Sequence, residues 1–199
     1  MIIGLLRHGE VEGGVRFRGS TDDALTPKGF SQMQASTNND ICWNKLISSP
    51  LVRCTKFANM YAKQYSLPLT LDARLQEMHF GKWEGRTVAE VFEDSPDELG
   101  RFWENPEKHS SPEGENFNHF KDRVINVWND IRAGDTDQRL LVVTHGGVIR
   151  IILCHLLVQS YKKLQDFEVK YGSLYNIHFN NGDIEIHTAE GKIMRAQNV

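Results

Sequence analysis

The sequence is poor in the features that mark secreted, zinc-binding and membrane-spanning proteins. It has three cysteines in 199 residues, Cys42, Cys54 and Cys154, which lie far apart and form no Cys-x-x-Cys pair. That spacing argues against a disulfide framework and against a thiolate zinc site. No apolar run approaches the length of a membrane span, and the amino terminus shows no basic segment or cleavage site of a signal peptide. We therefore expect a protein of a reducing compartment, the cytoplasm.

The chain also lacks a basic excess and the glycine-rich motifs of several enzyme classes. Its formal net charge is −3, so no overall positive field attracts nucleic acid or an anionic membrane. It contains no Gly-x-x-x-x-Gly-Lys loop, no Gly-x-Gly-x-x-Gly after the first apolar run, and no Gly-x-Ser-x-Gly elbow. These absences disfavour a P-loop nucleotide triphosphatase, a dinucleotide site and a serine hydrolase. We expect neither a nucleic-acid partner nor a membrane partner.

Two apolar runs, by contrast, each end in a histidine followed by glycine. Residues 2–6 precede Arg7-His8-Gly9, and residues 140–144 precede His145. Both runs have the length and residue types of buried strands, and open α/β sheets bind ligands at the carboxyl ends of their strands. Two such strands can bring two imidazoles to one pocket. Gly9 would let the backbone approach a ligand closely.

Charged side chains in a helix start and in two loops complete the set of candidate site residues. Arg53 lies in the first turn of a predicted helix, where a cation is unfavourable unless an anion is also present, so a solvated arginine and a ligand role both stay open. Arg16 and Arg18 lie in a loop that could fold over a site at the strand end. They either face an anionic substrate or are solvated, as exposed loop arginines usually are, and we favour solvation for both. Glu77 and Glu84 flank an aromatic-rich turn whose apolar residues could desolvate a carboxylate, as a general acid requires.

Strands and helices alternate through most of the chain, which predicts an α/β fold. We expect a three-layer sandwich with a mostly parallel sheet, helices on both faces and one antiparallel edge from a closing hairpin. Asn181-Gly182 predicts the hairpin turn, and Thr26-Pro27 predicts a helix start. Two helical pieces separated near Ser95-Pro96 predict a small helical lid or subdomain. It would occupy about residues 77–120 of a single domain that spans residues 1–199.

Five candidates lie at strand ends or helix starts: His8, His145, Arg7, Arg53 and Glu77. Together they suit a phosphoryl group better than a metal ion. Arginine binds phosphate oxygens in a bidentate manner and stays charged, whereas two arginines would repel a metal cation. A neutral imidazole can attack phosphorus in line, and surrounding cations stabilise the charge of the transferring group. We therefore expect phosphoryl transfer without a metal and without a cofactor.

The sequence resembles the histidine phosphatase superfamily, in its phosphoglycerate mutase-like branch. The matching segments occur in the family's order along the whole chain, at residues 6–10, 25–29, 48–53, 77–85, 112–115 and 143–147. The resemblance implies that His8 is the phosphorylated nucleophile and Glu77 the proton donor. It implies that the phosphoryl group is bound by Arg7, Arg53 and His145. Two positions depart from the pattern. Many relatives carry Asn six positions after the nucleophile, where this chain has Gly14, and Phe57 replaces the usual small polar residue in the helix after Arg53.

Within this family, the chain length and residues 75–84 are most similar to the α-ribazole-5′-phosphate phosphatases of cobalamin biosynthesis. That likeness implies a metal-independent hydrolase of small phosphomonoesters that acts through phosphohistidine. A phosphoglycerate mutase and a broad-specificity sugar phosphate phosphatase are the alternatives. The mutase is disfavoured because the chain lacks long insertions that would enclose a bisphosphate. A non-catalytic phosphate-binding module is disfavoured further, because all five core residues are present.

Overall fold

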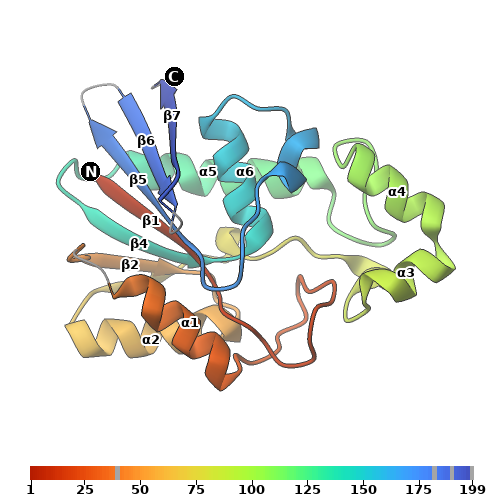
Figure 1. Ribbon diagram of the computed structural model, residues 1–199, viewed down its shortest axis with the longest axis horizontal. Coiled ribbons are helices and arrows are strands. Elements are labelled where there is room, and N and C mark those ends of the chain that lie inside the picture. The colour runs from red at the N-terminus through yellow and green to blue at the C-terminus, as the bar shows by residue number, and fades with distance from the viewer. Residues whose placement is uncertain (39–40, 181–182, 189–190, 198–199) are drawn as a thin grey trace.

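The fold is built on one mixed sheet with the strand order β3-β2-β4-β1-β5-β6-β7 (Figure 1). The computed structural model describes residues 1–38, 41–180, 183–188 and 191–197. The strands are β1 (Ile2–Arg7), β2 (Lys45–Ser48), β3 (Leu69–Leu71), β4 (Arg139–Thr144), β5 (Leu174–Asn180), β6 (Asp183–Thr188) and β7 (Ile193–Gln197). Strands β3, β2, β4 and β1 pair in parallel, and β5 pairs with β1 in the antiparallel sense.

The antiparallel part of the sheet is larger than the sequence predicted. Strands β5, β6 and β7 form an antiparallel series, so the expected hairpin is extended by a third strand. Strand β7 was not predicted: it lies at the sheet edge, where the apolar Ile193 is exposed and only Met194 and Ala196 pack against the core, so its apolar residues do not mark one face clearly. The predicted turn at Asn181-Gly182 lies outside the described residues. The α/β class, with helices on both sheet faces, is confirmed.

Helices cover both faces because alternate strand residues point to opposite sides. Leu140 and Val142 pack in the hydrophobic cluster that contains the apolar faces of α5 and α6. Leu141 and Val143 pack in the cluster that contains α1 and α2. Parallel strands buried on both faces have the continuous apolar sequence seen in β1 and β4. The helices are α1 (Pro27–Thr37), α2 (Val52–Tyr65), α3 (Val88–Asp94), α4 (Pro96–Glu104), α5 (Phe117–Arg132) and α6 (Gly146–Leu156).

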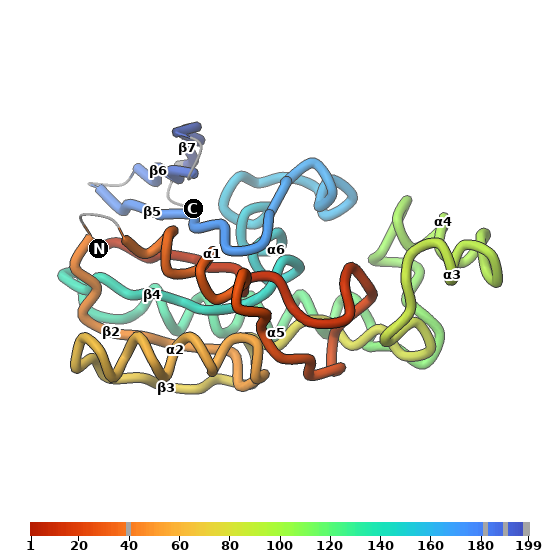
Figure 2. Tube along the Cα trace, turned by 60° about the horizontal axis from the view of Figure 1, so that its bottom comes forward, coloured from red at the N-terminus to blue at the C-terminus, as the bar shows by residue number. Residues whose placement is uncertain are grey.

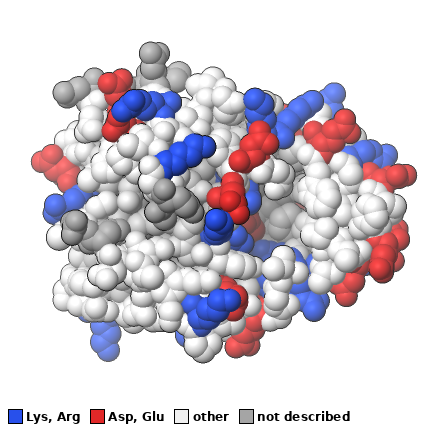
Figure 3. All heavy atoms as spheres, viewed as in Figure 1, with Lys and Arg blue, Asp and Glu red and all other residues white. Residues whose placement is uncertain are grey.

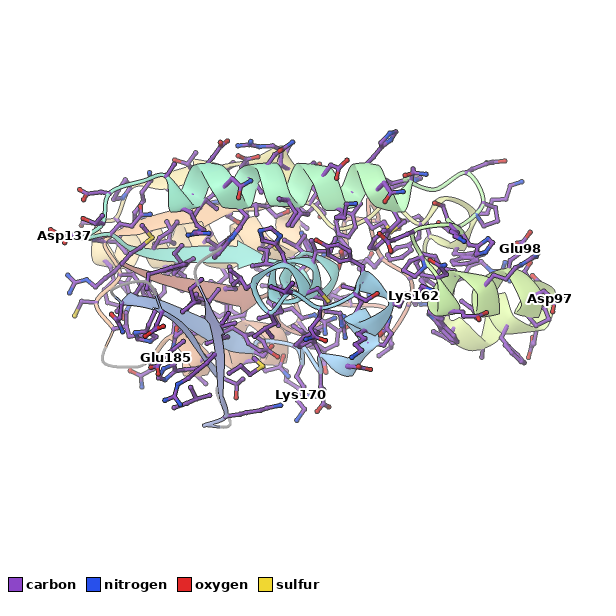
Figure 4. The ribbon with its side chains drawn as sticks, turned by 90° about the horizontal axis from the view of Figure 1, so that it is seen from above. Asp97, Glu98, Asp137, Lys162, Lys170 and Glu185 are labelled. Carbon is purple, nitrogen blue, oxygen red and sulfur yellow. The ribbon has the colours of Figure 1, made fainter. Side chains whose placement is uncertain are left out.

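Helices α3 and α4 lie to one side of the sheet layers (Figures 1 and 2). They are separated at Ser95, and Pro96 begins α4, as the sequence predicted. Asp97 and Glu98 occupy the first turn of α4 and lie at the outer end of this part (Figure 4), where acidic residues stabilise a helix start. Short 3-10 segments complete the chain at η1 (Ala73–Leu75), η2 (Gly81–Trp83) and η3 (Tyr161–Asp166). Among the described residues, no helix is long and apolar enough to cross a membrane.

Candidate active site

The two histidines predicted to converge lie side by side at the carboxyl edge of the sheet. Strands β1 and β4 are parallel neighbours in which Arg7 is paired with Thr144, so His8 and His145 leave the sheet at the same level. The backbone N–H of His8 donates to the Thr144 carbonyl at 2.9 Å. The two imidazoles meet edge to face, with 5.2 Å between ring centroids, and are 5% and 0% exposed.

His8 is held as a neutral imidazole with one nitrogen left for chemistry. Its Nδ1 lies 2.8 Å from the Gly9 carbonyl oxygen, which only accepts, so Nδ1 carries the proton and Nε2 carries the lone pair. Burial, followed by the charges of Arg7 and Arg53, holds the pKa of His8 well below its ordinary value. The ring is therefore unprotonated at neutral pH, which is the form a nucleophile needs.

His145 precedes α6 and has a protein partner at each ring nitrogen. Its Nδ1 accepts from Arg53 Nε at 3.3 Å, and its Nε2 lies 2.8 Å from the Ser49 hydroxyl oxygen. Burial first, and then the charges of Arg53 and His8, lower the pKa of His145 well below its ordinary value. Because Arg53 can only donate, Nδ1 carries the lone pair, and the proton lies on Nε2, which donates to Ser49. The neutral ring thus accepts from Arg53 and packs against His8.

Arg7 is anchored by Val169 and Tyr171 and keeps a buried N–H donor without a partner among the described residues. Its Nη1 donates to the Val169 carbonyl at 2.6 Å, and its guanidinium lies 4.1 Å above the ring centre of Tyr171. Its Nε is buried and has no hydrogen-bond partner among the described residues. A buried N–H without an acceptor is costly, so this geometry suits an anion that would accept from it.

Arg53 is fully buried, which rules out the solvated alternative. It lies in the first turn of α2, with 0% of its side chain exposed. Its Nη1 donates to the Thr21 carbonyl at 2.7 Å and its Nη2 to the Gly19 carbonyl at 2.8 Å. The loop around residues 18–21 thus positions a permanent cation beside His145, near the positive ends of α2 and α6.

The two carboxylates of the aromatic turn have different surroundings, and only Glu77 lies beside the histidine-bearing elements. Glu77 Oε2 accepts from the backbone N–H of Gly147 in α6 at 2.9 Å, and its Oε1 accepts from that of Met78. Glu84 instead accepts from the backbone N–H groups of Gly19, Ser20, Thr21 and Phe80. Burial opposes its ionisation, but these bonds and the Thr21 hydroxyl outweigh burial and lower the pKa of Glu84.

Comparison with known proteins identifies the family to which this constellation belongs. Residues 3–190 match the sequence profile of the histidine phosphatase superfamily, branch 1. The chain belongs to the histidine phosphatase superfamily. It is 25% identical over 203 residues to the adenosylcobalamin/alpha-ribazole phosphatase of Escherichia coli, with 100% of both chains covered. It is 29% identical over 178 residues to phosphoserine phosphatase 1 of Hydrogenobacter thermophilus, covering 87% of this chain and 84% of that one.

A solved structure supports the same fold assignment. The alpha-ribazole phosphatase of Shigella flexneri superposes with a TM-score of 0.80 at 24% sequence identity, covering 100% of this chain and 96% of that one. The family match and the phosphatase relatives together make this histidine phosphatase a phosphoric monoester hydrolase.

Two cavities meet at Glu77 in this histidine phosphatase. One, of about 150 Å³, extends toward α4 and is also lined by Gly147 and Arg150. Its walls carry seven aromatic side chains: Phe17, Phe80, Phe102, Trp103, Phe117, Phe120 and Tyr161. The other, of about 600 Å³, is lined mainly by polar residues, including Arg74, His79 and Glu115. Figure 3 shows a hollow between the sheet layers and the α3–α4 part, with basic side chains along its margin.

One sequence-based expectation about the amino-terminal loop is wrong. Arg18 is 7% exposed rather than solvated, because it pairs with Asp23 at 2.7 Å and donates to the carbonyls of Glu12 and Gly14. Arg16 is exposed, as expected, and donates to backbone carbonyls. Gly9 packs closely against α1, since a Cβ there would lie 1.9 Å from the Gly29 carbonyl oxygen.

Four further residues of the histidine phosphatase site were not singled out from the sequence. Ser49 contacts His145, and Tyr171 stacks on Arg7. Arg150 lies in α6, one turn beyond Gly146, and lines the aromatic cavity. Arg123 lies in α5 and contacts the backbone of the Glu77 turn. Only Ser49 had a sequence signal, since it lies between β2 and the helix start at Arg53.

Proposed function

We propose that this protein hydrolyses phosphomonoesters through a phosphohistidine at His8. Nε2 attacks phosphorus in line, the P–O bond to the alcohol breaks, and Glu77 supplies the proton that the departing alkoxide takes up. Water then attacks the phosphohistidine, Glu77 accepts its proton, and inorganic phosphate leaves with the histidine restored. The observation that carries this proposal is the neutral His8 ring, whose Nδ1 is committed to Gly9 while Nε2 is left for attack.

The basic groups around His8 supply the charge that such a step requires. The partnerless Nε of Arg7 and the buried guanidinium of Arg53 would hold the phosphoryl oxygens. His145 packs against His8 and accepts from Arg53, so its ring would border the same group while it orients the Arg53 cation. Charge in phosphoryl transfer is spread over the equatorial oxygens, so fixed cations in a dry site contribute most of the catalysis.

Trapping the intermediate tests this mechanism directly. Rapid acid and base quench with labelled substrate is expected to capture about one phosphoryl group per chain that is stable in base and labile in acid. It is expected to vanish in His8→Ala, whereas Arg16→Ala, an exposed loop variant, keeps it. A base-labile acyl phosphate, or unchanged turnover in His8→Ala, would overturn the mechanism.

For the alcohol part of the substrate, we propose a group with a flat apolar body, as in α-ribazole 5′-phosphate. The aromatic cavity supports this, because a cavity of about 150 Å³ accommodates a benzene-sized group. Aromatic side chains pack well on such a ring. The likeness to the alpha-ribazole phosphatases supports the same substrate class. Lys162 lies at the edge of η3 that faces α4 (Figure 4) and lines the same cavity, where it could meet a polar substituent.

Phosphoserine is the second candidate, favoured by the polar cavity on the other side of Glu77 and by the Hydrogenobacter relative. A panel that contains both esters separates the two. If the flat ring of α-ribazole 5′-phosphate occupies the aromatic cavity, Phe102→Ala is expected to raise KM for that ester about tenfold and to have little effect on phosphoserine. Phe92→Ala provides the matched control, because Phe92 is exposed on α3 and outside the cavity. Turnover of phosphoserine that exceeds that of α-ribazole 5′-phosphate and is unaffected by Phe102→Ala would reverse the assignment.

A phosphatase with this site is further expected to need no metal and to release phosphate rather than transfer it. Chelator should leave the rate unchanged, and vanadate should inhibit competitively; loss of activity in chelator, restored by a divalent ion, would contradict the metal-independent mechanism. With 3-phosphoglycerate and bisphosphoglycerate, isomerisation that outruns phosphate release would point to the mutase alternative.

We also propose a cytoplasmic location, which the three free cysteines support. We propose that an insert of about residues 77–120 covers the site.

A further inference from the structure

Arg123 of α5 binds the backbone of the turn that carries Glu77. Arg123 donates from Nη1 to the carbonyls of Arg74 and Gln76, at 2.8 and 2.7 Å, and from Nη2 to the Glu77 carbonyl at 3.1 Å. Its Nε and Nη2 also bind Glu115 in a bidentate ion pair, at 2.7 and 2.8 Å. Guanidinium has five N–H donors, and these five contacts account for all of them.

Glu115 extends the same support to the other side of the turn. Its Oε2 accepts from the backbone N–H of His79 at 3.3 Å, and its own N–H donates to the His79 carbonyl at 2.8 Å. The side chains of Arg123 and Glu115 are only 23% and 19% exposed, so solvent screens this pair weakly. The backbone on both sides of Glu77 is therefore fixed by one ion pair, while the Glu77 carboxylate points to Gly147.

We propose that Arg123, together with Glu115, is the positioning pair for the Glu77 proton donor. The inference rests on the proposed role of Glu77. Arg123 has no donor left for a substrate, which separates positioning from direct binding. A misplacement of about 1 Å can cost about a hundredfold in rate. Because proton transfer depends on distance more steeply than phosphoryl binding does, loosening this turn should impair the donor while the phosphoryl pocket stays intact.

The readout is the dependence on leaving group. An alkoxide needs a proton as it departs, whereas p-nitrophenolate does not, so loss of a proton donor falls on alkyl phosphates. Arg123→Lys keeps the charge but cannot reach three carbonyls and a carboxylate. It is expected to lower kcat/KM for an alkyl phosphate at least about tenfold more than for p-nitrophenyl phosphate, with vanadate inhibition unchanged within about twofold. Glu115→Gln is expected to give a smaller loss of the same kind.

Arg132→Lys is the matched control, because Arg132 lies nine residues further along the same helix, about 14 Å away by helical rise. Its kinetics should match the parent protein with both esters. Equal losses with both esters in Arg123→Lys, or weakened vanadate inhibition, would assign Arg123 a merely structural role. Glu115→Gln gives an independent answer should the lysine variant not fold. If Glu77→Gln shows selectivity and neither positioning variant does, this inference alone fails. If Glu77→Gln itself shows none, the donor role fails and this inference fails with it.

Discussion

At the scale of single residues, the two glutamates of the aromatic turn should separate by kinetics. Glu77→Gln is expected to cut kcat/KM for an alkyl phosphate by about a hundred- to ten-thousand-fold, and far less for p-nitrophenyl phosphate, because only the alkoxide needs a proton. Glu77 is assigned the donor role because its carboxylate accepts from the backbone N–H of Gly147, two residues after His145. Steady-state kinetics with the two esters measure the difference. Equal losses would show that Glu77 positions the site rather than donating a proton.

Glu84→Gln should behave differently, because its carboxylate holds the loop that holds Arg53. The N–H groups of residues 19–21 bind Glu84, while the carbonyls of Gly19 and Thr21 bind Arg53. An amide in place of the carboxylate loses acceptor capacity, so the loop and the guanidinium should move together. We expect similar losses of kcat/KM for both esters and weaker inhibition by vanadate. A leaving-group dependence in Glu84→Gln would exchange the roles of the two glutamates.

Residues that end a strand or begin a helix could be predicted as site residues, whereas those held by long-range contacts could not. His8 and His145 each interrupt an apolar run, and Arg53 occupies a helix start where a cation is unfavourable, so the local pattern marks all three. Arg123 lies among the residues of an ordinary amphipathic helix, and its role depends on carbonyls some fifty positions earlier. Arg18 resembles a solvated loop residue until Asp23 and two carbonyls are folded around it. Sequence spacing does not report such contacts.

At the scale of elements, the turn after β1 is packed backbone to backbone against the start of α1. A Cβ on Gly9 would lie 1.9 Å from the Gly29 carbonyl oxygen, and one on Gly29 would lie 2.0 Å from that of Glu10. Thr26 fixes this helix start, since its hydroxyl accepts from the Gly29 N–H at 2.9 Å. The strand end that bears His8 therefore requires glycine at both position 9 and position 29.

Gly9→Ala should accordingly damage both stability and activity. The backbone of Gly29 cannot move without disturbing α1, so we expect a loss of about 1–3 kcal/mol in the free energy of unfolding, by the usual cost of overpacking. The displaced His8 should also lower phosphoenzyme yield in rapid quench. Gly14→Ala serves as a steric control, because nothing lies within 4 Å of a Cβ there, although its φ of +73° adds strain. Unchanged urea stability in Gly9→Ala would contradict this close packing.

The strands buried on both faces were predictable from their composition, and the edge strand β7 was not. Strands β1 and β4 are buried on both faces, so continuous apolar runs reveal them. The helix starts at Thr26 and Pro96 follow from side-chain chemistry that acts within one turn. Among the described residues, strand β7 pairs with β6 alone, and exposed Ile193 and Arg195 leave just two of its residues, Met194 and Ala196, against the core, so its sequence pattern is too short to predict a strand.

At the scale of the whole molecule, two neutral histidines are buried among arginines, and this couples folding to pH. The ordinary imidazole pKa is about 6.5, and burial places the values of His8 and His145 in the folded protein well below it. Below pH 6.5 the unfolded chain therefore binds protons that the folded chain does not. The free energy of unfolding is at its full value above pH 6.5 and declines as the pH falls, by up to about 1.4 kcal/mol per pH unit for each histidine.

Urea denaturation between pH 7.5 and 5, in buffer without phosphate, measures this decline. Phosphate is omitted because binding to the folded state would stabilise it and mask the slope. His155 and His178 also have lowered pKa values, so the decisive comparison is between the parent protein and His8→Gln, in which one buried imidazole is gone. The slope of the variant should be shallower by up to about 1.4 kcal/mol per pH unit. Identical slopes, or a parent protein equally stable at pH 7 and pH 5, would mean that His8 is protonated in the folded state and unable to act as the nucleophile in that range.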